Sequence, residues 1–386
     1  MPDGAPSLTI ETIDSLAGTT AAEWDACAGA DNPFLSHAFL DAVERSASAT
    51  AETGWGPRHL LARDAGGTLL GAVPMYLKGH SYGEYVFDHS WAEAYRRAGG
   101  RYYPKLQACV PFTPVPGPRL LARPGPFADA VRAALADTLA GLPQRLGVSS
   151  LHVTFCTAEE AELFEDAGMV LRQGYQFHWT NRGYADFEAF LAELSHGRRK
   201  SIRKERREVA ELGIEHVRLT GSDIKAEHWD AFFDFYISTS DRKWGSPYLT
   251  REFFDRLGAS MADRVLLVLA RRAGNWIAGA LNLIGADTLY GRNWGCSEDH
   301  RFLHFETCYY QALEFAIERG LARVEAGAQG EHKLQRGYMP VPTWSAHAMR
   351  EEGFRTAVAE FCKREAEAVR EHIAALAAEG PFKSPA

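Results

Sequence analysis

Apolar residues recur along the second half of the chain with two different periods. They follow helical spacing from Trp229 to Ile237, whereas residues 264–270, 276–284 and 288–295 are short apolar runs typical of strands. The segments between these runs carry Gly, Asn and Asp, which favour hairpin turns. The pattern therefore predicts a helix followed by three antiparallel strands.

The helical period returns between Phe305 and Glu318, and Gly320 is a residue type that commonly ends a helix. Buried strands are predicted at 322–326 and 343–349. A last amphipathic helix has an apolar face made of Phe354, Val358, Phe361, Val369, Ile373 and Leu376.

The first half repeats this order of elements. It predicts strands at 59–63, 69–77, 148–155 and 169–179, and helices at 127–142 and 159–167. Both halves thus show hairpins, a helix, a central strand, a short helix and a strand. This predicts two α+β domains, residues 1–183 and 184–386, with mixed central sheets.

The element order is that of the GNAT fold of acyl-CoA N-acyltransferases, here present in tandem. In that fold two neighbouring parallel strands splay apart. The gap exposes backbone groups that can hydrogen-bond an extended acyl donor, at the sheet edge where α/β proteins generally bind ligands.

The composition is that of a soluble globular chain, with 46% hydrophobic and 24% charged residues among 386. A net charge of −8 gives no overall preference for nucleic acid or anionic membranes. The N-terminus lacks a basic segment followed by an apolar one, and no run of roughly 18 apolar residues occurs, so we expect a cytoplasmic protein without stable membrane insertion. Nothing indicates an oligomeric state.

The six cysteines are scattered, and none forms a C-x-x-C pair. This pattern favours reduced, buried thiols over disulfides or zinc ligands. No spacing of His, Asp and Glu predicts a metal site.

One local segment departs from the acidic average. The helix predicted at 196–212 carries seven Lys or Arg residues against two Glu up to position 208, a local charge of +5. Such a face can bind the phosphates of tRNA or of a nucleotide-linked precursor. The alternative is a solvated face that packs through its aliphatic stems. The predicted phosphate-binding residues are Arg198, Arg199, Arg203, Arg206 and Arg207.

Several longer motifs carry a family resemblance: HSYGEYVFD (80–88), YYPKL (102–106), PFTPVPGPRLL (111–121), YGRNWG (290–295) and LHFETCYYQALEFAIERGL (303–321). They resemble a bacterial family of peptidoglycan biosynthesis/recognition proteins in the GNAT superfamily, similar to the Fem-type aminoacyl transferases. The resemblance covers nearly the whole chain after about Asp31. It implies a tandem GNAT fold and does not by itself assign a reaction.

The donor is expected to be acyl-CoA or an aminoacyl-tRNA. A standard acetyl-CoA site has a turn of the form Arg/Gln-x-x-Gly-x-Gly/Ala, whose amides bind pyrophosphate. Residues 295–304 lack this turn and carry Glu298 and Asp299, which would repel pyrophosphate. Residues 111–126 also lack it, although they contain Arg119 and Arg123. Fem-type proteins share this departure, because their donor is a charged tRNA.

The stretch EAGAQGEHK (325–333) leaves the predicted central strand of the second half and is unusually rich in reactive side chains. Transfer to an amine needs a general base and a donor to the oxyanion. Glu306, Glu331 and His304 are the predicted catalytic residues. Glu325 is a further candidate for the base. The residues predicted to bind substrate here are Arg292, Asn293, Trp294, Glu325, Gln329 and Lys333. For each carboxylate a surface or salt-bridged role is the alternative.

In the first half, GHSYG (79–83) matches the nucleophile elbow G-x-S-x-G around Ser81. The strand before it belongs to a predicted hairpin, whereas the elbow needs a parallel sheet, so hydrolase chemistry is disfavoured. We expect His80 and Ser81 to line a substrate pocket. Tyr103 and Lys105 belong to an aromatic and basic cluster that can bind a sugar, a base or an anion, or simply form a half-buried loop.

These features predict an acyl- or aminoacyltransferase that acts on an amine of a peptide-like or cell-wall precursor by direct attack in a ternary complex. The alternative is a non-catalytic protein that recognises a peptidoglycan precursor or a nucleotide-linked ligand in the same cleft. A third possibility is RNA binding alone, through the basic helix.

Overall fold

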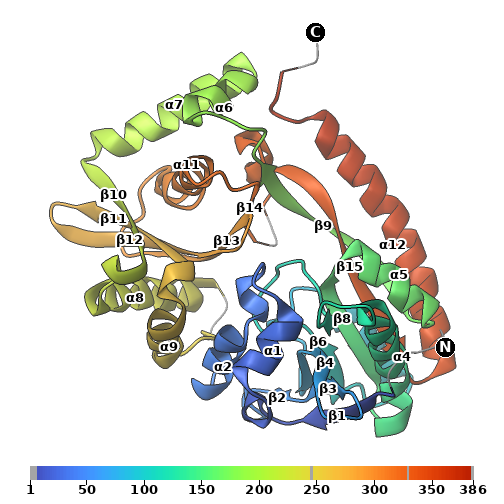
Figure 1. Cartoon of the computed structure of the whole chain (residues 1–386). Helices are drawn as coiled ribbons and strands as arrows, with labels where there is room; N and C mark the ends of the chain where they lie inside the picture. The colour runs from blue at the N-terminus through green and yellow to red at the C-terminus, as the bar shows by residue number, and fades with distance from the viewer. Residues whose placement is uncertain (1–6, 244–246, 328–329, 384–386) are drawn as a thin grey trace. The chain divides into compact units, whose positions relative to one another are not determined.

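A computed structural model describes residues 7–243, 247–327 and 330–383 (Figure 1). The chain forms two compact units. Unit 1 comprises Met1–Tyr175 and Pro342–Glu371, and unit 2 comprises Gln176–Val341 and His372–Ala386.

Two sheets and six helices make up most of unit 1. The strands are β1 (Thr9–Ile13), β2 (Trp55–Pro57), β3 (His59–Arg63), β4 (Leu69–Val73), β5 (Met75–Lys78), β6 (Lys105–Ala108), β7 (Leu121–Ala122), β8 (Ser150–Cys156) and parts of β9 (Val170–Thr180) and β15 (Met339–Met349). The helices are α1 (Ala21–Ala28), α2 (His37–Arg45), α3 (His89–Arg97), α4 (Ala128–Leu146), α5 (Ala158–Asp166) and most of α12 (Glu352–Ala378).

The smaller sheet of unit 1 has the order β1-β3-β4-β7, and the larger one runs β15-β8-β6-β5-β2. Within the larger sheet β6 and β8 are parallel, and the other neighbouring pairs are antiparallel. A parallel pair needs a crossover, and α4 supplies it.

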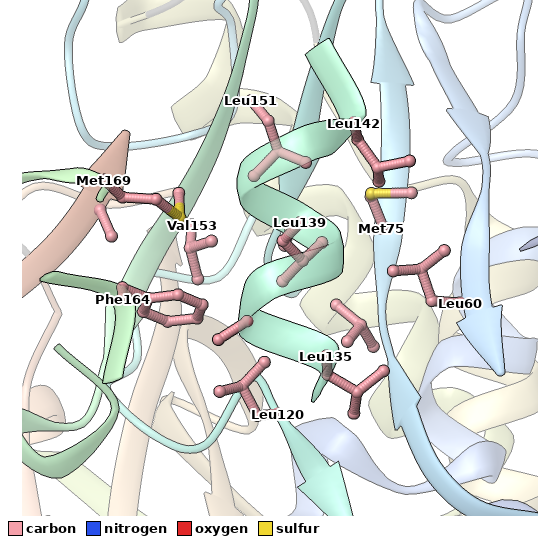
Figure 2. Close-up of a cluster of buried hydrophobic side chains, with 14 of the residues drawn as sticks. Leu60, Met75, Leu120, Leu135, Leu139, Leu142, Leu151, Val153, Phe164 and Met169 are labelled. Atoms are coloured by element: carbon pink, nitrogen blue, oxygen red, sulfur yellow. The ribbon is translucent and has the colours of Figure 1, made fainter. Parts of the chain in front are cut away.

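The apolar core of unit 1 lies around α4 (Figure 2). Leu135, Leu139 and Leu142 follow helical spacing and face the sheets, where they meet Leu60 and Val153. Gly71 in β4 permits this approach, because a Cβ there would overlap the side chain of Val131.

Alternation gives the larger sheet of unit 1 two different faces. Leu106 of β6 and Leu151 of β8 point into the core around α4. The next residues along the strands point to the opposite face, and they are polar although they are buried. These polar residues are Lys105, Gln107, His152, Thr154, Ser345 and His347. A buried polar layer costs free energy unless its groups are paired.

Unit 2 contains β10 (Ile214–Thr220), β11 (Val265–Arg272), β12 (Asn275–Ile284), β13 (Thr288–Cys296), β14 (Arg323–Glu325) and the remaining part of β9. Its sheet has the order β10-β11-β12-β13-β14-β9, in which only β13 and β14 are parallel. The helices are α6 (Phe187–Glu193), α7 (His196–Glu211), α8 (Ala226–Lys243), α9 (Arg251–Met261), α10 (Leu303–Phe305) and α11 (Gln311–Glu318).

The crossover between β13 and β14 is one continuous helical segment. It runs through α10, a π-helical turn at Glu306–Tyr310 and α11, and it ends before Gly320, which has φ +64°. π-Helical turns often occur at functional sites because they re-aim side chains. The following 3-10 helix, η6 (Glu331–Arg336), leads into β15.

The predicted strands and helices of both halves are confirmed, with two differences. The run 69–77 is two strands, β4 and β5, separated at Pro74, which has no N–H to give to a ladder. The helix predicted from Phe305 begins at Leu303 and contains the π-helical turn, which apolar spacing does not reveal.

The domain limits 1–183 and 184–386, which rest on a repeated order of elements, stay a prediction. The compact units differ from these limits, because Pro342–Glu371 folds with unit 1 and the change of unit after Tyr175 falls inside β9.

All six cysteines are free thiols. Within the described ranges no group of three His, Cys, Asp or Glu residues is placed to hold a metal ion. None of the helices in the described part of the chain is both long enough and apolar enough to cross a membrane.

Gly295 tests the packing of α8 on β13. A Cβ at this position would overlap the backbone carbonyl of Phe235 in α8, which cannot move without displacing the helix. We expect Gly295→Ala to lower the free energy of unfolding by about 2–3 kcal/mol or more, as measured by urea denaturation. Gly197→Ala in α7 is the control. Its Cβ would meet open space, so we expect a gain of up to about 1 kcal/mol. Equal effects of the two changes would contradict this account of α8.

Candidate functional site

The parallel strands β13 and β14 separate after only three residue pairs. Thr288 pairs with Arg323, Leu289 with Val324 and Tyr290 with Glu325, where β14 ends while β13 continues to Cys296. Among the described residues no further strand pairs with this side of β13. A register shift leaves Arg292 without an opposite residue on β12, which marks a β-bulge in β13 at the same level. Unit 2 therefore contains the splayed parallel pair that the sequence predicts.

Glu325 lies at the point of separation. It is opposite His178 of β9 on one side and Tyr290 of β13 on the other, so the three side chains share a face of the sheet. Burial raises the pKa of Glu325 to about 8, with Arg323 acting in the opposite direction. Its Oε2 atom has no hydrogen-bond partner in the described part of the chain. A buried carboxyl with a free oxygen and this pKa can take or give a proton near neutral pH.

His178 does not compensate the charge of Glu325. Its Nδ1 lies 3.7 Å from Glu325 Oε1, but burial lowers the pKa of His178 to about 3, so the ring is neutral at physiological pH. Burial also raises the pKa of Tyr290, so that its phenol is neutral.

Lys333 reaches back toward the same strand end. Its ammonium donates a hydrogen bond to the carbonyl of Gly327, at 3.0 Å. Burial lowers the pKa of Lys333 to about 8. Gly327 and Gly330 have φ values of +77° and +118°, which glycine adopts without strain, and they turn the chain back on itself. Gln329, the amide predicted to contact substrate, lies outside the described residues.

An aromatic cluster collects other predicted residues. The rings of Trp294 and His304 lie 5.1 Å apart, and His304 is 5.3 Å from Tyr309. Tyr309 is hydrogen-bonded through its hydroxyl to His332 Nε2, at 2.9 Å. Asn293 directly precedes Trp294 in β13, and its Oδ1 atom finds no partner among the described residues.

Glu306 and Glu331, the two predicted catalytic carboxylates, have very different surroundings. Glu306 is buried and accepts two hydrogen bonds from Arg206, both at 3.0 Å, and one from Gln311, at 2.7 Å. The side chain of Glu331 is 68% exposed and lies 3.8 Å from His372. Glu306 thus has the salt-bridged role that is the alternative to catalysis, and Glu331 lies at the surface.

The five predicted phosphate-binding arginines divide in the same way. Arg206 faces inward, between Glu306 and Glu314. Arg203 and Arg207 are exposed and pair with Glu188 and Glu211. Arg198 and Arg199 are half-buried.

Unit 1 contains an equivalent strand separation, but its own chain fills it. β6 ends at Ala108, opposite Val153, whereas β8 continues to Cys156. The carbonyl of Thr154 accepts a hydrogen bond from the guanidinium of Arg119, at 3.0 Å. The next carbonyl, of Phe155, accepts one from the amide of Gly117, also at 3.0 Å. The groups that an extended donor would bind are therefore already paired.

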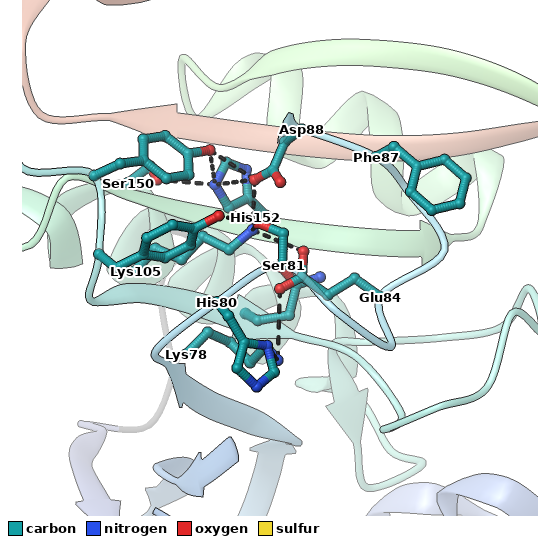
Figure 3. Close-up of polar contacts among 12 residues, drawn as sticks. Lys78, His80, Ser81, Glu84, Phe87, Asp88, Lys105, Ser150 and His152 are labelled. Atoms are coloured by element: carbon teal, nitrogen blue, oxygen red, sulfur yellow. Dashed lines mark hydrogen bonds and ion pairs between the residues drawn. The ribbon is translucent and has the colours of Figure 1, made fainter. Parts of the chain in front are cut away.

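The polar face of the same sheet holds the residues that the sequence predicts to bind substrate in the first half (Figure 3). Ser81 is hydrogen-bonded to Tyr103, at 2.8 Å, and accepts a hydrogen bond from Lys105, at 3.0 Å. His80 lies 3.4 Å from the ammonium of Lys78. The structure therefore brings together His80, Ser81, Tyr103 and Lys105, which come from two separate motifs.

Lys105 is the centre of this group. Burial would lower its pKa, but ion pairs with Glu84, at 2.7 Å, and with Asp88 outweigh burial and raise the pKa. Because Lys105 stays protonated, it cannot serve as a base for Ser81. The nucleophile-elbow alternative has no other support, since the strand before Ser81 is antiparallel to both of its neighbours.

The network continues through two histidines in the next strands. Tyr102 donates a hydrogen bond to Asp88, at 2.7 Å, and contacts His152. The Nδ1 atoms of His152 and His347 lie 2.7 Å apart, which requires one ring to donate and the other to accept. Burial lowers the pKa of both rings, that of His152 to about 3, so the pair is neutral.

A family model described as peptidoglycan biosynthesis/recognition matches residues 15–384. The chain belongs to the FemAB-like family. The resemblance seen in its motifs is confirmed. No functionally curated protein matches the sequence.

Solved structures with similar folds have little sequence in common with this FemAB-like chain. The C-terminal domain of a putative lysylphosphatidylglycerol synthetase from Agrobacterium fabrum aligns with a TM-score of 0.56 and 8% identity, over 91% of this chain and 97% of that one. A structure named FemX has a TM-score of 0.54 and 11% identity, over 86% and 96%. L-PGS from Bacillus licheniformis has a TM-score of 0.50 and 9% identity, over 84% and 93%. At such identities the likeness concerns the fold, and the predicted mixed α+β, tandem GNAT-like fold is confirmed.

Acyl-CoA does not fit the crossover of unit 2 in the usual GNAT manner. The turn before α10 has Glu298, a carboxylate that lies 2.8 Å from Arg272 and 2.6 Å from His300, so these two side chains are already paired. Asp299 adds a second carboxylate, and no glycine-rich turn offers amides to a pyrophosphate.

Several residues of the two groups were missed from the sequence of this FemAB-like protein. His152 and His178 lie in strand-like runs, and no local motif marks them as site residues. One signal in β8 could have revealed the polar group of unit 1. Ser150, His152 and Thr154 are polar at alternate positions of a strand that is buried throughout. Asp88 and Glu84 belong to a quoted motif, but nothing local shows that they meet Lys105, which is 17 and 21 residues away.

The burial of Glu325 predicts a pH-dependent stability. The ordinary pKa of 4.5 applies to the unfolded chain and about 8 to the folded one, so the folded state holds the proton more tightly and stability falls as pH rises between these values. Glutamine does not titrate, so the Glu325→Gln variant should not lose stability in this way as the pH rises. We expect its free energy of unfolding to exceed that of the wild type by on the order of 2–4 kcal/mol above pH 8, with little difference near pH 5.

The control is Glu331→Gln, whose side chain is exposed, and it should change stability by less than about 0.5 kcal/mol at either pH. Urea denaturation at several pH values measures both variants. A Glu325→Gln difference that stays constant with pH would mean that Glu325 is not held in a protonation-sensitive site.

Lys105 gives a second stability prediction. Lys105→Met keeps the aliphatic stem but leaves Glu84 and Asp88 buried without their shared cation. We expect a loss of about 3–5 kcal/mol in the free energy of unfolding. Lys363→Met on the exposed side of α12 serves as the control and should cost less than about 0.5 kcal/mol. A similar small loss for both would show that the Lys105 ion pairs contribute nothing net.

Proposed function

We propose that this FemAB-like protein is an acyl- or aminoacyltransferase that modifies an amine of a peptide-like cell-wall precursor. The observation that carries the proposal is Glu325: a buried carboxyl with a pKa of about 8, whose Oε2 has no hydrogen-bond partner among the described residues, lies where two parallel strands separate. The description of the family, peptidoglycan biosynthesis/recognition, supports a cell-wall precursor as the acceptor. The buried carboxyl supports an amine as the acceptor, because an amine that attacks an acyl carbon must lose a proton to a general base.

The reaction is a direct transfer. The acceptor amine attacks the carbonyl carbon of an activated ester or thioester, forming a C–N bond, and the C–O or C–S bond to the donor's leaving group breaks. Glu325 takes the proton that the nitrogen loses, and this proton then passes to the leaving group. Lys333, close to the same strand end, is suited to stabilise the negative charge on the carbonyl oxygen.

An enzyme-bound covalent intermediate is not part of the proposal. Burial raises the pKa of Cys109 and Cys362 to about 12, which keeps both as unreactive thiols. Lys105, which donates a hydrogen bond to Ser81, is held as a cation by two carboxylates and so cannot take the proton of the serine.

Unit 2 is the half proposed to seat the donor. Beyond Tyr290, β13 pairs with β12 on one side, but on the side of β14 no strand of the described part of the chain continues beside it, which is where an extended donor would lie. In unit 1, Arg119 and Gly117 already hold the corresponding carbonyls. The polar group around Ser81 and Tyr103 is then a site for recognition and not for transfer.

The alternative function is recognition of a precursor without catalysis. It is favoured by the salt bridges that hold Glu306 and by the absence of a usual pyrophosphate turn before α10. A protein that only binds would use the same polar groups, but it would not need a carboxyl with a raised pKa.

Transfer of label to a lysine-containing peptide tests the proposal. The purified chain is incubated with the peptide and either labelled acetyl-CoA or a mixture of labelled aminoacyl-tRNAs, and the product is measured by mass spectrometry. We expect the wild type to transfer from one donor class and Glu325→Gln to be slower by a factor of about 10²–10⁴, the usual contribution of a general base.

Glu331→Gln is the matched control, and we expect it to retain at least about half of the wild-type rate because its side chain is exposed. Equal rates for Glu325→Gln and the wild type would remove Glu325 as the base. Binding of the peptide with no transfer from either donor class would favour the recognition function.

A further inference from the structure

The outward face of α7 carries a row of four cations, Lys200, Arg203, Lys204 and Arg207, which we call the outer cation row. Their spacing places them on one side of the helix. The side chains of Arg203, Lys204 and Arg207 are 53%, 56% and 64% exposed. Beyond one end of the row lies Arg301, which is 72% exposed.

Residues on the inward face of α7 hold the helix against the rest of unit 2. Ile202 and Val209 are buried. Glu205 accepts hydrogen bonds from Tyr310 and Arg336, and Arg206 pairs with Glu306 and Glu314. Because these contacts anchor the helix, the outer cation row is not needed for packing.

The partners of the outer cation row are weak. Lys204 lies 3.5 Å from Glu208 and Arg207 lies 3.6 Å from Glu211, both as neighbours one turn apart on the helix. Arg203 pairs with Glu188, which is 64% exposed. Ion pairs of this kind contribute little and are screened by salt, so an anionic surface can replace them.

The surroundings of the outer cation row favour a flat anionic partner over a nucleic acid. A pocket of about 370 Å³ beside α7 is lined by four carboxylates, Asp186, Glu188, Glu314 and Glu318, together with Arg206, Ala185, Phe187 and Ile317; Arg206 is already paired with Glu314. A nucleic-acid strand that followed the surface from α7 into this pocket would meet carboxylates. A planar surface touches only the outermost side chains. No Phe, Tyr or Trp in α7 is present to stack on bases.

We propose that α7 docks the protein onto an anionic phospholipid surface. The contact is peripheral, because the row presents charges and the helix has no apolar outer face to insert. It brings a chain of net charge −8 to a negatively charged surface by one helix, in a fixed orientation. The proposal is independent of the transfer reaction, since no residue of the outer cation row is assigned a part in it.

Vesicle sedimentation tests the docking. The full chain is mixed with vesicles of phosphatidylcholine that contain about 30% phosphatidylglycerol, or with vesicles of phosphatidylcholine alone, at about 0.05 M and about 0.5 M NaCl. We expect binding to the anionic vesicles at low salt, at least tenfold stronger than to neutral ones, and its loss at high salt. The triple variant Arg203→Glu, Lys204→Glu, Arg207→Glu should bind at least tenfold more weakly than the wild type.

The matched control is Arg96→Glu with Arg97→Glu on α3, whose side chains are 70% and 74% exposed and have a similar exposed glutamate partner. We expect this variant to bind anionic vesicles as the wild type does. Circular dichroism verifies that both variants are folded. No binding of the wild type at low salt, or equal losses in the two variants, would overturn the proposal. So would binding of bulk tRNA that depends on the outer cation row, if vesicles are not bound.

Discussion

The parallel pairing of β13 with β14 ends after three residue pairs, and the chemistry of unit 2 is arranged around that end. Once β14 stops, no strand in the described part of the chain continues beside β13 on that side. Glu325 is the last residue of β14, and burial there raises its pKa to about 8. The glycines at 327 and 330 then let the chain turn back, so that Lys333 returns to the same strand end. One short pairing thus brings a proton acceptor and a cation to the edge of an open sheet.

In unit 1 two parallel strands also separate, but the protein's own chain fills the gap between them. Arg119 is fully buried, and its guanidinium donates to the carbonyls of Val115, Gly117, Pro118 and Thr154. Glu160 accepts hydrogen bonds from the amides of Arg119 and Leu120 and so holds this segment in place. The gap is closed by the protein itself. The polar residues of unit 1 lie instead on the other face of the sheet, where Lys105 joins Glu84 and Asp88 in a group that is buried and electrically compensated.

Basic side chains therefore have different roles in buried and in exposed positions. Arg206 and Lys105 are held inside by pairs of carboxylates and fix elements of the fold. Arg203 and Arg207, on the same helix as Arg206, point outward and have only exposed partners. The sequence shows α7 as one basic block, because helical spacing distributes charge without telling which face will be buried. The carboxylates that pair with Arg206 belong to Glu306 and Glu314, about a hundred residues later in the chain.

The sequence alone determined the element order, the α+β class and the strand end that holds Glu325, because periodicity and turn residues are local signals. The family was indicated by the resemblance of its longer motifs. It also drew attention to Ser81, Tyr103 and Lys105, which the structure brings into contact; their role in binding stays a prediction. The tertiary structure decided what each residue can do. Burial and partners come from distant segments, so only the folded chain shows that Glu306 is salt-bridged, that Glu331 is exposed and that Glu325 keeps a free oxygen among the described residues. A pKa depends on solvation and neighbouring charge, and neither can be known before the chain is packed.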